Sequence, residues 1–187
     1  MSKKVLVFFA DGCEEIEALA PVDMLRRAGA DVTIVGVRGK TQVSSHGISV
    51  NTDIALSELG TEKDFDMIVL PGGIPGTNHL DASEEVDRYI KRAVEEGKFI
   101  GAICAAPSIV LGSRNLLDHK KATCYPGMEP GMKGHIPTDK KVVVDGKIIT
   151  AAGVGVSVEF GLTLVGALYG KRVQDDLAKK VVLKWQI

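Results

Sequence analysis

The sequence predicts an α/β fold in which helices cover a mostly parallel sheet. Short runs of apolar, often β-branched residues alternate with amphipathic stretches of helical length, which is the pattern of parallel strands joined by helical crossovers. With 187 residues, one domain can bury about 70% of the surface that the unfolded chain exposes. We therefore expect residues 1–187 to form a single domain without any stabilising cross-link.

The expected core strands are short apolar runs at residues 5–10, 31–37, 65–70 and 99–103. Asp145-Gly146, between apolar runs at 141–144 and 147–150, is a strong signal for a two-residue hairpin turn. Residues 43–52 alternate apolar and polar positions around His46-Gly47, so they are expected to form an edge excursion of the same sheet.

Helices are expected over residues 14–28, 83–96, 105–111, 157–169 and 173–181. Pro21 lies inside the first of these, so a kink or a late start is expected there. Ser83 with acids in the following turn gives a capping-box pattern, and Ser157 is expected to be the N-cap of its helix. The Gly- and Pro-rich residues 125–140 are expected to form a surface loop within the domain.

Charge and cysteine content exclude several classes of protein. Lys and Arg total 23 against 24 Asp and Glu, without long blocks of like charge, so no dedicated nucleic-acid site is expected. The 3 cysteines are far apart and form neither a disulfide framework nor a Cys-x-x-Cys pair, which indicates a reducing compartment and a cytoplasmic location. The first apolar run is too short for a signal peptide or a membrane span, so no membrane role is expected.

Cys104 is the strongest candidate for a reactive residue. Ala102 and Ala106 flank it at the spacing of a strand-to-helix elbow, where bulkier neighbours would clash. A thiol above a helix N-terminus is expected to have a pKa below the free value of about 8.5. The backbone amide of Ala105 would point toward a developing oxyanion. The alternative is that Cys104 is a small buried hydrophobe at a strand end.

Glu17 is the candidate partner of this thiol. Acids in a first helical turn are most often surface charges that compensate the helix dipole, which is the simpler interpretation of Glu14 and Glu15. Position 17 faces the apolar side with Ala20 and Pro21, where a buried carboxyl has a raised pKa and stays protonated. A neutral carboxylic acid beside a thiolate would act as hydrogen-bond donor and proton shuttle.

Other polar residues carry weaker signals. The histidines 46, 79, 119 and 135 lack metal-ligand spacing, so no metal is expected. Gly72-Gly73 matches no phosphate-binding motif and is expected only to bring backbone amides near the site. Cys13 and Cys124 are expected to be packing residues or incidental surface thiols, and Trp185 a packing or subunit-contact residue.

Several segments together make the chain resemble the ThiJ/PfpI superfamily, in the branch of the Parkinson-disease-associated protein DJ-one. They are GCEEIEALAPVDMLRRAGADVT, DMIVLPGG, FIGAICAAP and GVGVSVEFGL, and the match runs nearly end to end. The resemblance implies a flavodoxin-like, doubly wound sandwich of the class I glutamine amidotransferase type, and a homodimer. It places Cys104 at the reactive-cysteine position and Glu17 at the position of the acid that hydrogen-bonds it. Gly73 and Ala105 match backbone-amide positions beside the cysteine.

The family is associated with cofactor-free conversion of 2-oxoaldehydes such as methylglyoxal to hydroxy acids, and with deglycase activity on early glycation adducts. The resemblance therefore implies a glyoxalase- or deglycase-like enzyme without a cofactor, whose partners are a small 2-oxoaldehyde or glycated substrate and a second copy of the chain. The family's cysteine is also oxidised to sulfinate under stress. The alternatives are therefore an oxidative-stress sensor or redox-regulated chaperone, and, more remotely, a flavin-binding electron carrier.

The chain departs from the family pattern at named positions. Tyr125 stands where the human-type branch has a histidine, and a phenol with a pKa of about 10 is a poorer base, so weaker activity or sole reliance on Glu17 is expected. Together with Gly73 and Ala105, Tyr125 is expected to bind the oxyanion or substrate. Ala152-Gly153-Val154 replaces an Arg-Gly-Pro segment at the pocket rim. Ala105, where the protease-like branch has histidine, disfavours peptidase activity.

Overall fold

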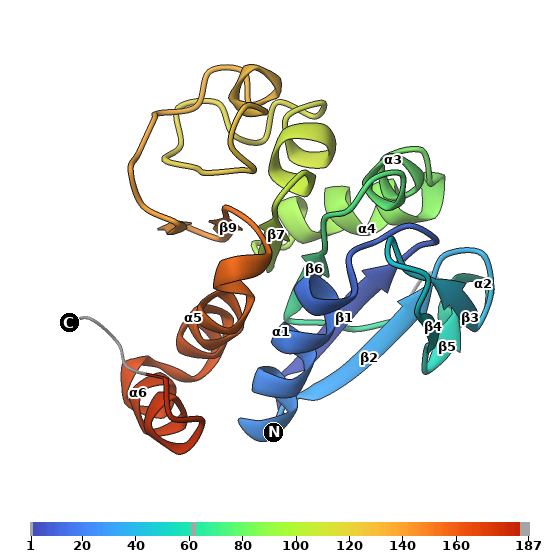
Figure 1. Cartoon of the computed structure of the whole chain (residues 1–187), viewed down its shortest axis with the longest axis horizontal. Helices are drawn as coiled ribbons and strands as arrows, with labels where there is room; N and C mark the ends of the chain where they lie inside the picture. Colours follow the sequence, from blue (N-terminus) through green and yellow to red (C-terminus); the bar gives the residue numbers. More distant parts are fainter. Residues whose placement is uncertain (1, 61–62, 184–187) are drawn as a thin grey trace.

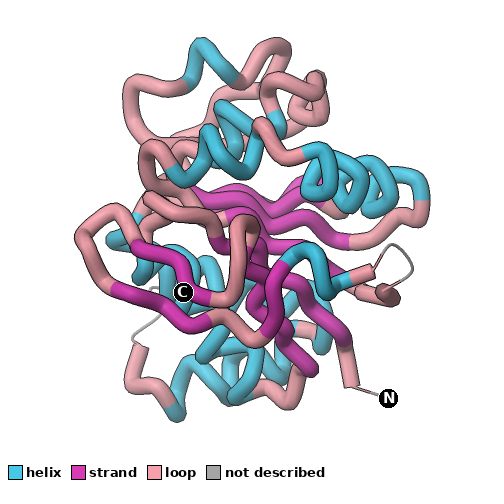
Figure 2. Tube along the Cα trace, turned by 90° about the vertical axis from the view of Figure 1, so that its right-hand side faces the viewer, coloured by secondary structure: helices cyan, strands magenta, loops and turns pink. Residues whose placement is uncertain are grey.

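A seven-stranded sheet lies between two helical layers in the computed structural model, which describes residues 2–60 and 63–183 (Figure 2). The strand order is β5-β2-β1-β6-β7-β9-β8, and every neighbouring pair except β8 and β9 is parallel. The bounds are β1 Lys4–Phe9, β2 Asp31–Gly36, β5 Ile54–Ala55, β6 Met67–Leu70, β7 Phe99–Ile103, β8 Val142–Asp145 and β9 Ile148–Ala151. The predicted mostly parallel sheet and the hairpin turn at Asp145-Gly146 are confirmed.

The central strands are apolar because both of their faces are covered. In β1 the side chains from Val5 to Phe9 are all buried, and Val7 pairs with Ile34 of β2 on one side and Val69 of β6 on the other. A strand covered on both sides reads as a continuous apolar run rather than an alternating one. The carboxyl ends of β1, β6 and β7 therefore meet at one edge of the sheet, and the loops that follow them form the site.

The helices divide between the two faces of the sheet (Figures 1 and 2). Their bounds are α1 Glu15–Arg27, α2 Leu56–Leu59, α3 Gly76–Asp81, α4 Glu84–Glu95, α5 Ser157–Tyr169 and α6 Lys171–Lys180. Helices α1 and α5 pack against each other on one face, where Gly161 leaves room for Pro21: a Cβ at position 161 would lie 2.9 Å from the Pro21 Cα. Helix α4 covers the other face against β6 and β7, and α3 packs beside it, in contact with α4 and β1.

Residues 43–52 do not extend the main sheet, so that prediction was wrong. Strands β3 (Thr41–Val43) and β4 (Ser49–Asn51) form a separate antiparallel pair. The backbone groups of Val43 are already used by the loop after β1, because its N–H donates to Asp11 Oδ1 (2.7 Å) and its carbonyl accepts from Gly12 N–H (2.8 Å). The edge of the main sheet is instead formed by β5.

Three helix-end predictions have mixed outcomes. Helix α1 begins at Glu15 and continues through Pro21, so no late start occurs. Ser83 caps α4 by accepting from Val86 N–H (3.3 Å), although Val86 cannot return the second hydrogen bond of a capping box. Ser157 is not a cap: it has helical dihedral angles because the 3₁₀ turn Val154–Val156 runs directly into α5, and its Oγ has no hydrogen-bond partner among the described residues.

The remaining predicted segments have simpler outcomes. The segment after Cys104 is helical as predicted, but residues Pro107–Leu111 form a π-helix. Helices α2 and α3 were not predicted from the sequence. Among the described residues, no helix is both long and apolar enough to cross a membrane. Trp185 lies outside the described residues.

Candidate active site

Cys104 stands on the predicted elbow between β7 and the helical segment that follows. Its φ of +62° lies in the left-handed region, which a side chain with a Cβ adopts only when the surroundings impose it. Two backbone hydrogen bonds do so: Cys104 N–H donates to the Ala151 carbonyl (2.9 Å), and the Cys104 carbonyl accepts from Tyr125 N–H (2.8 Å). The backbone N–H groups of Gly73 and Ala105 donate to the Cys104 sulfur, so both amides lie where they were predicted.

Glu17 reaches the same point from α1. Its side chain is only 1% exposed, forms a hydrogen bond with Cys104, and accepts from Gly72 N–H at 3.0 Å through Oε2. Helix α1 is fixed in this position because Glu14 caps it, accepting from Glu17 N–H at 2.6 Å. Burial, helped by the nearby charge of Glu14, raises the pKa of Glu17 to about 7, against the lowering effect of the hydrogen bonds from Cys104 and from the Gly72 and Val154 backbone. The prediction of a buried carboxyl with a raised pKa is confirmed.

The prediction of a low pKa for Cys104 is wrong while Glu17 is ionised. Burial, together with the charge and hydrogen bond of the Glu17 carboxylate, raises the pKa of the Cys104 thiol to about 12, against a smaller opposite effect of the Gly73 and Ala105 amides. The stabilisation of a thiolate by the helix N-terminus is outweighed by the cost of placing a second negative charge beside a buried carboxylate.

The two groups consequently titrate as a pair. They lose a first proton at about pH 7 and a second at about pH 12. Between these values the pair carries one negative charge and one proton, which the Cys104 thiol holds and donates in a hydrogen bond to the Glu17 carboxylate. Moving this proton from sulfur to Glu17 creates a thiolate that is stabilised by the acid proton and by the amides of Gly73 and Ala105. The pair can therefore supply a nucleophile and a proton from the same site.

Gly72 brings its backbone amide to Glu17, as expected, and its missing side chain has a second role that was not expected. A Cβ at this position would lie 2.4 Å from Glu17 Oε2 and 2.5 Å from Cys104 Cβ, so only glycine lets the two groups meet. Gly73 is restricted for another reason: its φ is +88°, and a Cβ there would lie 2.4 Å from Glu14 N. The Pro-Gly-Gly string after β6 was the available signal, because adjacent glycines at a strand end indicate close backbone approach.

Replacing Gly72 by Ala is expected to reduce the reactivity of Cys104 by at least about 100-fold and to destabilise the fold by about 1–3 kcal/mol, because the methyl group separates Glu17 from Cys104. The measurements are the rate of Cys104 alkylation and urea unfolding. Gly153→Ala is the matched control, since a Cβ there would meet Tyr125 Cδ2 at 3.6 Å and Glu17 Oε1 at 3.9 Å, which are ordinary contacts. Equal rates in the two variants would contradict the close fit at Gly72.

Tyr125 lies at the rim of the site. Its backbone N–H donates a hydrogen bond to the Cys104 carbonyl. Its side chain is about half exposed and, with Gly153 and Val154, lines a hollow of about 360 Å³. The same segment approaches Glu17, because the backbone N–H of Val154 donates to its carboxylate. Among the described residues that line the hollow, Tyr125 is the one predicted site residue. Cys104, Glu17, Gly73 and Ala105 meet next to the hollow, where the Gly153–Val154 segment of its wall approaches Glu17.

Cys13 and Cys124 are buried, as expected for packing residues. Burial raises the pKa of Cys13 to about 12 and that of Cys124 to about 11. They therefore serve as internal controls for Cys104.

Glu14, Glu15 and His46 have ligand atoms within 4.8 Å of one another, which among the described residues is close enough to hold a metal ion. Glu14 already caps α1, and His46 Nδ1 lies 3.2 Å from Glu15 Oε1. The positive end of α1 also opposes a cation at this place. We assign no metal to this cluster.

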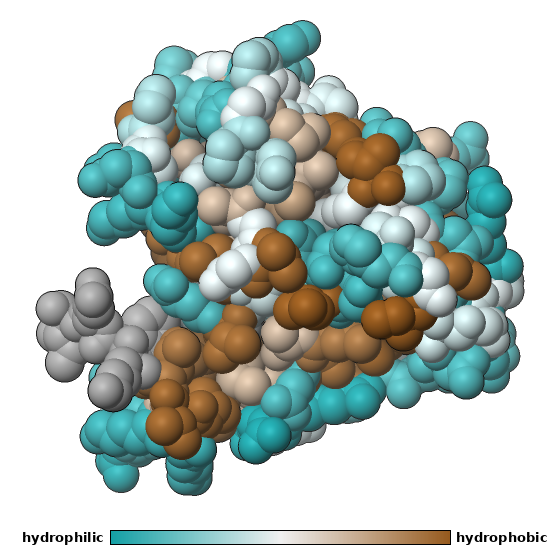
Figure 3. Space-filling view, viewed as in Figure 1, coloured by the Kyte–Doolittle hydropathy of each residue, from teal (hydrophilic) through white to brown (hydrophobic). Residues whose placement is uncertain are grey.

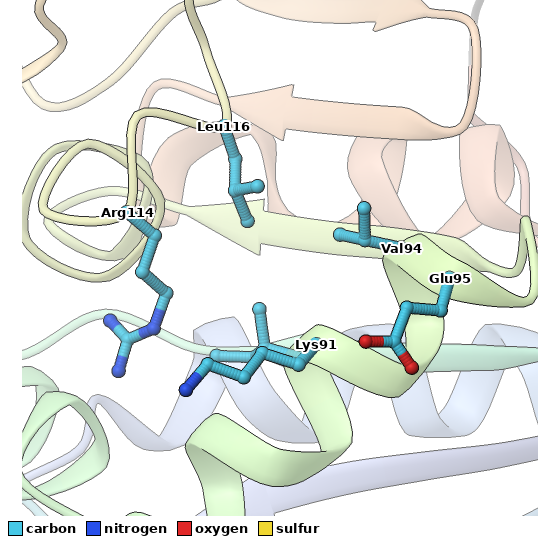
Figure 4. Close-up of a pocket in the computed structure, with 6 residues that line it drawn as sticks. Lys91, Val94, Glu95, Arg114 and Leu116 are labelled. Atoms are coloured by element: carbon cyan, nitrogen blue, oxygen red, sulfur yellow. The ribbon is translucent and has the colours of Figure 1, made fainter.

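A second hollow, of about 320 Å³, lies beside α4 and shares no residue with the site (Figure 4). Lys91, Val94, Glu95, Arg114 and Leu116 line it. The guanidinium of Arg114 pairs with Asp81 and Asp87, so it is not available to a ligand. We assign no function to this hollow.

Fold and site together define an α/β protein with a cysteine on a strained elbow, hydrogen-bonded to a buried acid. Residues 3–167 match the model of the DJ-1/PfpI family, and the chain belongs to this family. It is 40% identical over 185 residues to "Protein DJ-1 homolog B" of Arabidopsis thaliana, covering 98% of this chain and 42% of that protein. The chain thus spans less than half the length of that relative.

Two further comparisons bear on the activity and the fold. The chain is 31% identical over 175 residues to "Glutathione-independent glyoxalase DJR-1.2" of Caenorhabditis elegans, covering 92% of each. The structure of oxidized Toxoplasma gondii DJ-1 superposes with a TM-score of 0.94 at 34% identity, covering 98% of this chain and 100% of that one. The expected flavodoxin-like fold and family membership are both confirmed.

Proposed function

We propose that this protein converts 2-oxoaldehydes, or their early glycation adducts, to hydroxy acids without a cofactor. The observation that carries the proposal is the hydrogen bond between Cys104 and the buried Glu17, under the amides of Gly73 and Ala105. These are the groups that covalent aldehyde chemistry needs: a nucleophile, a proton carrier with a pKa near neutrality, and oxyanion donors. The glyoxalase relative supports the same assignment.

The first step forms a bond between the Cys104 sulfur and the aldehyde carbon. The proton of the pair first moves from the Cys104 sulfur to Glu17, so that the sulfur attacks as a thiolate, and the aldehyde oxygen then takes this proton from Glu17 to give a hemithioacetal. The backbone amides of Gly73 and Ala105 stabilise the oxygen while it carries negative charge. Glu17 is left as a carboxylate and can act as a base.

The second step moves hydrogen between adjacent carbons. Glu17 removes the proton from the former aldehyde carbon, and protonation of the ketone oxygen gives an enediol. The proton is then returned to the former ketone carbon while the hydroxyl on the sulfur-bearing carbon loses its proton, so that a thioester of a 2-hydroxy acid results. One carbon is oxidised and its neighbour reduced, and no external oxidant is needed. Water then cleaves the carbon–sulfur bond, which releases the hydroxy acid and restores the Cys104 thiol.

The test is whether purified protein turns methylglyoxal into lactate without glutathione, followed by proton NMR. Saturable production of lactate supports the proposal. Consumption of the aldehyde without lactate would show only that Cys104 or surface amines trap it, and would contradict the proposal.

A second candidate function is supported by the difference in burial among the thiols. Cys104 is partly accessible, whereas Cys13 and Cys124 are buried, and the groups around Cys104 can donate hydrogen bonds to sulfinate oxygens. We propose that Cys104 is also the residue oxidised under stress, in a sensor or redox-regulated chaperone. Mild peroxide should add two oxygens to Cys104 first; equal oxidation of the three cysteines, measured by mass spectrometry, would oppose this role.

We further propose that the chain forms a homodimer through α1 and the β3–β4 pair. Ile16, Leu19, Val43 and Ile48 are between 37% and 51% exposed, and a contact of 3.2 Å between His46 Nδ1 and Glu15 Oε1 joins the two elements. Figure 3 shows apolar side chains gathered across the middle of this face, where α1 lies.

The free thiols support a reducing, cytoplasmic location for the protein.

The double replacement of Ile16 and Leu19 by Asp is expected to convert a dimer to a monomer, because it would bury two charges in an apolar interface. Light scattering after size-exclusion chromatography measures the mass. Val94→Asp is the control, since Val94 is 50% exposed on α4, remote in sequence from the proposed interface. An unchanged dimer in the double variant would place the interface elsewhere.

A further inference from the structure

The hollow beside the Cys104–Glu17 pair contains one charged side chain among the described residues that line it, Lys141. Lys141 directly precedes β8, and its carbonyl accepts from Ala152 N–H at 2.8 Å, which fixes its backbone to the opposite wall of the hollow. Its side chain therefore originates next to the segment 152–156, of which Gly153 and Val154 approach Glu17.

The ammonium group of Lys141 is not neutralised by the protein. No carboxylate within the described residues lies within 4.0 Å of it, in contrast to Lys3, Lys4, Lys91 and Lys98, which each form ion pairs. The other described residues of the hollow are uncharged, and most of them are small or apolar. Lys141 is exposed, so its ammonium group is free to contact an anionic group that occupies the hollow.

The size of the hollow indicates a ligand larger than a three-carbon aldehyde. Its volume of about 360 Å³ falls in the range of pockets that hold small organic ligands. Cys104 does not line this space, but Gly153 and Val154 do, and they approach Glu17, the hydrogen-bond partner of Cys104. A substrate whose carbonyl reacts at the Cys104 sulfur can therefore extend a substituent past Tyr125 and Gly153 into the hollow, toward Lys141.

We infer that the site selects substrates that carry an anionic group, a carboxylate or a phosphate, and that Lys141 binds this group. The inference rests on the proposed function for the identity of the substrate. It extends that function because the substrate class becomes the acidic 2-oxoaldehydes and the adducts of acidic molecules. Lys141 acts here in binding and specificity and takes no part in the chemical step.

The direct test uses the alkylation of Cys104 and needs no turnover. Iodoacetate and iodoacetamide are similar in size and differ in charge, so the ratio of their rates at Cys104 reports the charge around the sulfur. Lys141→Gln is expected to lower the iodoacetate-to-iodoacetamide ratio about 3- to 10-fold, and Lys141→Arg to retain it. Lys140→Gln is the control, because Lys140 is exposed and does not line the hollow. A ratio that is the same in Lys141→Gln and the parent protein would overturn the inference.

The second test compares two substrates, one with a negative charge and one without. The methylglyoxal adduct of N-acetylcysteine carries a carboxylate, and the adduct of N-acetylcysteine amide does not. Lys141→Gln is expected to raise KM about 5-fold for the first and leave KM for the second, and kcat for both, unchanged. An equal effect on both adducts would refute the anion specificity. Absence of turnover of either adduct by the parent protein would refute the proposed function, while the alkylation ratio would still decide the role of Lys141.

Discussion

Cys104→Ala is expected to lose at least about 10³-fold in the rate of lactate formation from methylglyoxal, because the other two described thiols, Cys13 and Cys124, are buried and Cys104 is the thiol paired with Glu17. The side chain removed is small, so the fold should persist. The measurement is the initial rate by NMR, with circular dichroism to verify folding. Cys124→Ala is the matched control, as Cys124 is buried and its thiol donates to the Tyr125 carbonyl. Parent-like lactate formation by Cys104→Ala would show that the sulfur is not the nucleophile.

Glu17→Gln is expected to reduce the same rate by about 10²-fold, the usual contribution of a positioned acid–base group. The amide can still accept from Gly72 N–H, but it cannot carry a proton between the substrate carbons. Lactate formation across pH 6–9 measures the effect. If the variant kept the parent rate, another group, such as the exposed Tyr125, would have to move the proton.

The same variant is expected to be more stable than the parent above pH 7. Burial raises the pKa of Glu17 from 4.5 to about 7, so the folded protein holds this proton more tightly than the unfolded chain. The stability that this provides is fully present below pH 4.5 and is lost as the pH rises through about 7. Glu17→Gln removes the loss, which is on the order of 1–3 kcal/mol. Thermal unfolding at pH 5 and pH 8 separates a loss of chemistry from a loss of fold.

The sequence was sufficient to predict the core of the fold because its signals are local. Continuous apolar runs identified β1, β6 and β7, and Asp145-Gly146 identified the hairpin of β8 and β9. The flanking alanines of Cys104 indicated the elbow, and the apolar face of α1 indicated the buried Glu17. Each of these depends on neighbours within one turn or one strand.

The errors arose where distant segments compete for the same backbone groups or charges. Residues 43–52 pair with themselves because Asp11 and Gly12 use the backbone of Val43, which alternation along the chain does not reveal. The pKa of Cys104 depends on Glu17, which is 87 positions away in the sequence. Position 72 must be glycine because a side chain there would clash with both Glu17 and Cys104. The position of Lys141 across from Ala152 likewise follows from the pairing of β8 with β9.

The most direct test of the coupled titration of Cys104 and Glu17 is the pH dependence of Cys104 alkylation by iodoacetamide in the parent protein and in Glu17→Gln. The pair predicts a rise in rate centred near pH 7 in the parent, a plateau above it, and no such step in the variant, whose thiol titrates alone. A single rise near pH 8.5 in both proteins, as in an ordinary thiol, would contradict the coupling of Cys104 to Glu17.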